Sequence, residues 1–169
     1  MKLKRVILYV LTLILFFNLP YKIFGQNRAF TKDDIRILES KGLIIRERPD
    51  TWKTKEGLII SGYDSDGKTR LEHIMKHAVD VKGKNRHGVF TVEYENIIIL
   101  MDELWISIKK GELLPSHDGA RRVYVYDTKK KIGYLGGREG QKQGFPSLKK
   151  VRLVLEGKTP RVVTFYPVK

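Results

Sequence analysis

The sequence contains no cysteine in 169 residues. This absence excludes a disulfide scaffold, thiolate zinc sites, iron–sulfur clusters and a thiol nucleophile, while zinc bound by His and carboxylates stays open. Acidic residues are also scarce, because 19 Asp and Glu stand against 33 Lys and Arg, a formal charge of +14. Such an excess indicates a polyanionic partner, nucleic acid or an anionic envelope surface, or else a basic protein whose charge only aids solubility.

Long hydrophobic runs are absent after residue 19. Residues 6–19 are mostly apolar and follow a basic start. This run is shorter than the ~20 apolar residues of a membrane-spanning helix and resembles the apolar region of ~7–15 residues in a secretory signal peptide. We expect residues 1–25 to be a signal peptide and the protein to be secreted, or periplasmic in the cell envelope. The alternative is an uncleaved anchor, with membrane contact through residues 6–19.

The full chain's length and its 41% apolar content suit one domain. After residue 25, helical signals dominate the first part of the chain. Thr31 followed by two Asp marks a helix start, and Gly42 marks its end. The spacing of apolar residues predicts further helices over 70–81 and 96–110. Residues 57–60 and 89–92 are predicted to be short strands.

After residue 121 the apolar residues alternate with polar ones, which is typical of strands. Two hairpins are predicted, 122–135 with a turn at 129–131, and 150–166 with a turn at 157–160 and Pro167 as its end. Residues 136–144 are predicted to be a flexible glycine-rich loop. Helices first and strands later predict an α+β fold, with N-terminal helices packed on a C-terminal antiparallel sheet of about four strands. We expect an N-terminal extension over 26–56 and a functional domain over 57–169.

Three of the four histidines lie within fifteen residues: His73, His77 and His87. Two imidazoles suit phosphodiester cleavage by an internal 2′-hydroxyl, because one removes the 2′ proton and the other protonates the leaving 5′ oxygen. A cation then stabilises the phosphorane, and no metal or cofactor is needed. The alternative is a metal hydrolase in which His73 and His77 bind zinc with Glu72 or Asp80. The spacing His-Ile-Met-Lys-His lacks the Glu that a zincin uses as its base.

A family resemblance rests on the sequence around His73, on His87-Gly88, and on the terminal Val163-Thr-Phe-Tyr-Pro167. Over roughly residues 57–169 the chain resembles the EndoU-type endoribonucleases of the barnase–EndoU–colicin–RelE superfamily, which includes toxin domains. The resemblance implies metal-independent RNA cleavage that leaves a 2′,3′-cyclic phosphate. His87 would be the base and His73 the acid, or the reverse.

The same resemblance implies that Tyr166 packs against the ribose and that Thr164 shapes the nucleotide pocket. Strand alternation alone predicts Thr164 and Tyr166 as exposed neighbours of a core Phe165. The family also uses a catalytic Lys at the start of a strand. We assign it to Lys149, although Lys150 is adjacent and points to the opposite face of the strand.

The basic residues near these positions are expected to bind RNA. They are Lys82, Lys84, Arg86, Arg138, Lys142 and Lys150; Arg138 or Lys142 is an alternative source of the catalytic charge. His77 is expected on the helix surface, and His117 and the acidic turn at 63–68 are expected to face solvent. Together these features predict a secreted endoribonuclease, toxin or degradative enzyme, with single-stranded or loop RNA as substrate and an immunity protein as a further partner. The alternative is a non-catalytic basic module that binds polyanions.

Overall fold

The computed structural model describes residues 28–169. The predicted signal peptide lies outside the described residues. The chain forms helices α2 (Lys32–Ser40), α3 (Arg70–Met75), α4 (Tyr94–Lys109) and α5 (Gly137–Lys142), with a 3-10 turn η1 (Lys76–Ala78) after α3. The strands of the described part form three antiparallel sheets. The predicted α+β class is therefore confirmed, although the strands do not form one sheet.

The N-terminal part consists of α2 and a meander of three strands, β1 (Ile44–Arg48), β2 (Thr51–Thr54) and β3 (Ile59–Ser61). Thr31 caps α2 as predicted, and Gly42 follows the helix with a φ of 64°. The sequence analysis predicted neither β1 nor β2. The boundary expected between residues 56 and 57 falls inside this meander. Its core side chains belong to the same buried cluster as those of the later elements, so both parts share one core.

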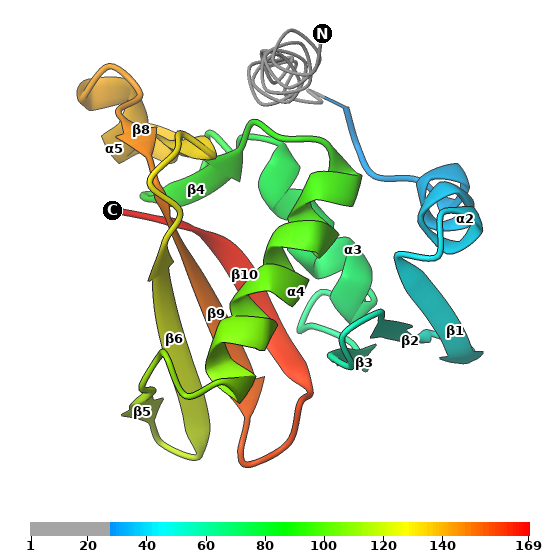
Figure 1. Cartoon of the computed structure of the whole chain (residues 1–169). Helices are drawn as coiled ribbons and strands as arrows, with labels where there is room; N and C mark the ends of the chain where they lie inside the picture. Colours follow the sequence, from blue (N-terminus) through cyan, green and yellow to red (C-terminus); the bar gives the residue numbers. More distant parts are fainter. Residues whose placement is uncertain (1–27) are drawn as a thin grey trace, which may run out of the picture.

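The largest sheet has the strand order β10-β9-β6-β5, with β5 (Ser116–Asp118), β6 (Arg121–Asp127), β9 (Lys150–Glu156) and β10 (Val162–Val168). Helix α4 lies across one face of this sheet, and α3 lies beside β10 (Figure 1). The predicted β9–β10 hairpin is confirmed. Pairing continues through Pro167 to Val168, because β10 is an edge strand and tolerates the missing N–H.

The third sheet has the order β4-β7-β8, with β4 (His87–Phe90), β7 (Gly133–Gly136) and β8 (Ser147–Leu148). The predicted hairpin over 122–135 is wrong, because β7 pairs with β4 and β8 and not with β6. Alternation identifies a strand but does not specify its partner. The predicted glycine-rich loop is also wrong, since residues 137–142 form α5. A Cβ on Gly140 would lie 2.0 Å from the Leu135 carbonyl oxygen, so this glycine permits close packing.

The sheet β4-β7-β8 and the sheet β10-β9-β6-β5 are in close backbone contact where β4 meets β10. A Cβ on Gly88 would lie 1.9 Å from the carbonyl oxygen of Pro167. Only a residue without a side chain therefore permits this backbone contact. The contact fixes the first residues of β4 against the last residues of β10, where the sequence motifs lie.

Replacing Gly88→Ala is expected to lower the free energy of unfolding by about 1–3 kcal/mol, because the added methyl group forces the two strands apart. Urea unfolding at neutral pH measures this loss. Gly83→Ala is the matched control, since nothing lies within 4 Å of a Cβ at that position. Equal stability of the two variants would show that the close approach is not a constraint.

Candidate functional site

Four rings from four elements converge beside the edge strand β10. The His77 ring of η1 lies 6.1 Å from the His73 ring of α3, 4.7 Å from the His87 ring of β4 and 5.1 Å from the Tyr166 ring of β10, between centroids. The His87 and Tyr166 rings are both stacked on His77, at 20° and 16° to its plane. The structure therefore brings the predicted His73, His87 and Tyr166 together around a residue that had no assigned role.

His77 was expected on the helix surface, but it is buried, because the chain turns into η1 and continues toward β4. Its Nδ1–H donates to the Gly88 carbonyl oxygen at 2.9 Å, which leaves Nε2 as the unprotonated nitrogen. Within residues 28–169, Nε2 of His77 makes no hydrogen bond and is not among the fully buried atoms without a partner. Burial, reinforced by the nearby His87, lowers the pKa of His77 to about 3, so the ring is neutral at physiological pH.

His73 is the most accessible of the three rings, with 27% of its side chain exposed. Its Nδ1–H donates to Oδ2 of Asp64 at 2.9 Å, and its Nε2 lies 3.4 Å from the hydroxyl oxygen of Thr164. Asp64 therefore fixes the orientation of the ring and directs Nε2 toward β10. This pairing resembles the carboxylate–imidazole unit of acid–base catalysts.

Asp64 belongs to the acidic turn that was expected to face solvent, yet only 6% of its side chain is exposed. Its Oδ1 accepts hydrogen bonds from the backbone N–H groups of Asp66 and Lys68, both at 2.9 Å. Burial alone raises the pKa of Asp64, but the bonds from His73 and these N–H groups outweigh it and lower the pKa to about 2. The signal available in the sequence was an aspartate-rich turn nine residues before His73.

His87 lies behind His77 and is 3% exposed. Its Nε2–H donates to the Val79 carbonyl oxygen at 3.1 Å. Burial, with the positive charge of Lys84, lowers the pKa of His87. Both effects favour the neutral form of the ring, and its Nε2 is already engaged by the backbone.

Thr164 and Tyr166 lie on the face of the sheet opposite the core, and Phe165 between them is fully buried. Tyr166 pairs with Arg152 of β9, whose Nη1 lies 3.4 Å from the tyrosine hydroxyl oxygen. Arg152 therefore lies beside Tyr166, and it was not among the residues predicted from the sequence. The strand alternation of β9 could have indicated Arg152. It follows Lys150 by two residues, so both side chains lie on the same face of the strand.

The basic residues predicted from the sequence are all exposed, in the loop before β4, on α5 and at the start of β9. Lys149 is exposed between β8 and β9, and Lys150 is exposed at the start of β9. Lys82, Lys84 and Arg86 are exposed in the loop before His87, and the Lys84 carbonyl oxygen accepts from the backbone N–H of Arg138 on α5 at 3.0 Å. Loop 82–86 and α5 thus form one basic corner. Lys142 pairs with Glu139 at 3.7 Å.

The carboxylates of the zinc alternative are engaged elsewhere. Glu72 accepts from the backbone N–H and the hydroxyl of Thr69 in the cap of α3, both at 2.8 Å. Asp80 accepts from the backbone N–H of Gly137 at 2.8 Å. In the described part of the chain, no three His, Asp or Glu side chains are grouped in a way that could hold a metal ion.

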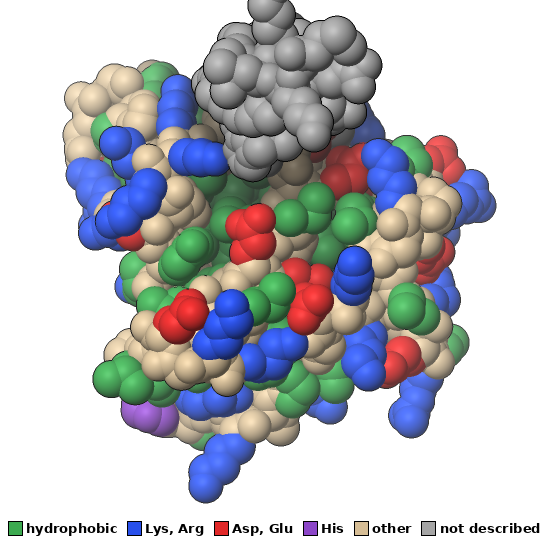
Figure 2. Space-filling model, in the orientation of Figure 1, with side chains coloured by type: hydrophobic (Ala, Val, Ile, Leu, Met, Phe, Trp, Pro, Cys, Tyr) green, Lys and Arg blue, Asp and Glu red, His purple; other side chains and the backbone are tan. Residues whose placement is uncertain are grey.

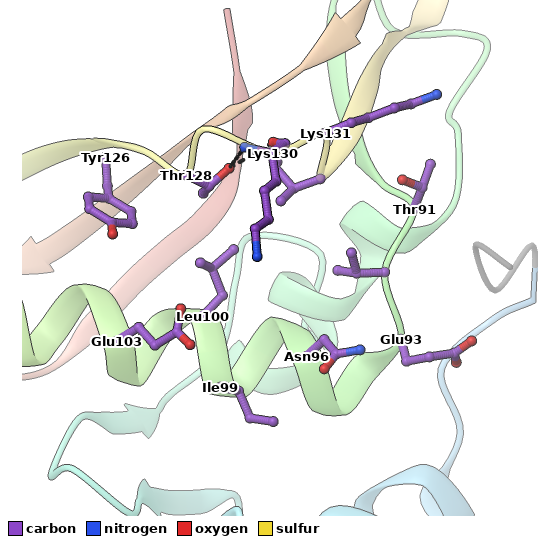
Figure 3. A pocket seen from close by; sticks show the side chains of 12 residues that line it. Thr91, Glu93, Asn96, Ile99, Leu100, Glu103, Tyr126, Thr128, Lys130 and Lys131 are labelled. Atoms are coloured by element: carbon purple, nitrogen blue, oxygen red, sulfur yellow. Dashed lines mark hydrogen bonds between the residues drawn. The ribbon is translucent and has the colours of Figure 1, made fainter. Parts of the chain in front are cut away.

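A groove of about 360 Å³ lies away from the histidines, between the N-terminal half of α4 and the β6–β7 connection (Figure 3). Glu93 and Glu103 line one wall, and Lys130 and Lys131 line the other. The lining of this groove combines two glutamates with two lysines and contains no histidine. The histidine cluster is therefore the better candidate for a catalytic site.

Lys and Arg side chains spread over the face shown in Figure 2 and gather near α5 and β8, whereas Asp and Glu lie among them over α4. Across residues 28–169, no helix has the length and apolar character needed to cross a membrane. Comparison of the chain with protein-family models, curated proteins and solved structures finds no match.

The buried His77 is expected to make the protein less stable in mild acid. The folded ring stays neutral down to about pH 3, whereas the ring in the unfolded chain binds a proton near the ordinary histidine pKa of 6.5. Stability is therefore lost as the pH falls below that value. Relative to wild type, His77→Phe should reduce the loss between pH 7 and pH 5 by about 2 kcal/mol, measured by urea unfolding. His117→Gln, at an exposed position on β5, should leave the pH dependence unchanged.

Proposed function

We propose that the protein is a metal-independent endoribonuclease that cleaves RNA by attack of a 2′-hydroxyl, leaving a 2′,3′-cyclic phosphate. The observation that carries the proposal is the convergence of two differently held imidazoles, His73 and His77, with Tyr166 on one edge of the sheet. Transesterification of RNA needs two proton-transfer groups and a pocket for a ribose, and it needs no cofactor.

The environments of the two rings favour different roles. His77 donates through Nδ1 to the Gly88 carbonyl, so its Nε2 is unprotonated and without a hydrogen bond, and we assign this nitrogen as the acceptor of the 2′-hydroxyl proton. His73 is accessible, and its bond to the Asp64 carboxylate directs Nε2 toward Thr164 and the open side of the site. His73 is therefore assigned as the acid that protonates the leaving 5′ oxygen.

His87 supports this pair from behind. The EndoU resemblance pointed to His87 as the second imidazole, but its contact with the Val79 carbonyl and its burial favour a packing role against His77. Thr164 and Tyr166 keep the roles that the resemblance implies, with the threonine hydroxyl near the acid and the aromatic ring beside the base. Single-stranded or loop RNA is the proposed substrate, because an unpaired ribose can reach in-line geometry.

His73→Ala is expected to lower the rate of oligoribonucleotide cleavage by about 10²–10⁴-fold, since it removes the general acid. The assay contains EDTA, and the products are analysed by mass spectrometry for the 2′,3′-cyclic phosphate. His77→Asn should cause a loss of the same order, whereas His87→Asn should act mainly through stability. His117→Gln is the control for loss of an exposed histidine.

A substrate with a single ribonucleotide in a DNA strand tests the chemistry further. Cleavage should occur only on the 3′ side of that ribonucleotide and should disappear when it is replaced by a deoxyribonucleotide. Wild-type activity in His73→Ala, or cleavage without a 2′-hydroxyl, would contradict the mechanism. Tight binding without any cleavage would instead support the alternative of a non-catalytic polyanion-binding module.

A further inference from the structure

Two arginines beside the candidate site have a polar atom without a partner. Among residues 28–169, the buried side-chain nitrogen and oxygen atoms that lack a hydrogen bond are Nε of Arg70 and Nε of Arg152. Buried polar atoms are ordinarily satisfied, so an exception indicates strain or a missing ligand. Both exceptions are guanidinium nitrogens, the donors that best match a phosphate group.

Arg152 is placed against the ring that the proposed mechanism assigns to the ribose. It lies on β9 between Tyr166 of β10 and Val125 of β6. The centre of its guanidinium is 6.0 Å from the Tyr166 ring centroid, and Nη1 lies 3.4 Å from the hydroxyl oxygen. No carboxylate of the described residues forms an ion pair with Arg152. A half-buried positive charge without a counter-ion favours an anionic ligand.

Arg70 lies on α3, the helix that carries His73. It precedes His73 by three residues on α3, so the two side chains are neighbours on one helix face. Its Nη2 donates to the Tyr63 carbonyl oxygen at 3.0 Å, beside Asp64 in the sequence. Arg70 also forms no ion pair within the described chain. Arg70 is therefore next to His73, as Arg152 is next to Tyr166.

We propose that Arg152 and Arg70 bind two phosphates of a single-stranded nucleic acid, with Arg152 at the phosphate beside Tyr166. The assignment of Arg152 to the reacting phosphate rests on the proposed function. In each arginine, Nε and an adjacent Nη are two parallel donors that one phosphate can accept, and Nε has no hydrogen bond to give up. Arg152 then supplies the positive charge that the resemblance sought at Lys149.

The test measures binding without cleavage. A short fluorescein-labelled oligodeoxythymidylate has the phosphates of RNA but no 2′-hydroxyl, and its affinity is measured by fluorescence anisotropy over a range of salt concentrations. Arg152→Gln and Arg70→Gln should each weaken binding and reduce the slope of log affinity against log salt by about 0.7, the contribution of one phosphate contact on a single strand. Arg152→Lys should keep the slope, because it keeps the charge.

Arg36→Gln is the matched control, because Arg36 is exposed on α2 and pairs with Asp33 at 2.7 Å. It should leave the slope unchanged. Thermal unfolding of each variant shows whether the fold is intact. If Arg152→Gln does not fold, Arg152→Lys replaces it in the test, because it keeps a charged side chain at that position. Slopes equal to wild type in folded Arg152→Gln and Arg70→Gln would overturn the proposal.

The outcome is separable from that of the proposed function. If both arginine variants reduce the salt slope of binding but the protein does not cleave RNA, the phosphate site is supported and the nuclease proposal is contradicted. If the protein cleaves RNA but the two variants leave the salt slope unchanged, the nuclease proposal is supported and the phosphate site is contradicted. If both proposals hold, Arg152→Lys should lower the cleavage rate constant by about 10²-fold at saturating RNA, because a single ammonium cannot replace the two-pronged contact.

Discussion

The backbone contact between Gly88 and Pro167 is the constraint on which the rest of the site depends. It sets β4 directly against β10, and it places the Gly88 carbonyl where it accepts from His77. That bond selects the tautomer of His77, and the same approach brings His87 and Tyr166 onto its ring. One close contact between two strands therefore determines the protonation, burial and stacking of the central imidazole.

The electrostatic character of the site differs from that of the surrounding surface. Elsewhere acids form surface ion pairs with basic side chains, as Glu139 does with Lys142 and Asp33 with Arg36. At the site the carboxylate is used to orient an imidazole, and the adjacent guanidiniums have no acid partner. Exposed pairs contribute little to stability, whereas an unpaired, half-buried cation attracts an anion strongly. The excess positive charge of the chain is thus most effective where it is not neutralised.

Much of the fold could be predicted because its signals are local. The cap at Thr31 and the helical spacing over 96–110 depend on neighbouring residues, and α2 and α4 occur close to the predicted positions. The partner of β7 could not be predicted, because alternation is the same whichever strand lies alongside. The glycines of residues 136–144 suggested a flexible loop, yet Gly140 allows α5 to pack on the backbone of β7.

The chemical groups available to the protein can be read from its sequence: a histidine cluster before a terminal Thr-x-Tyr, no thiols, and a large positive charge. The differences between these groups arise from the fold. The spacing of His73, His77 and His87 treats them alike, but one ring is held by a carboxylate, one is enclosed between two rings, and one is bound to a backbone carbonyl. Burial and hydrogen bonding depend on segments distant in sequence, so the protonation state of each ring is a property of the folded protein.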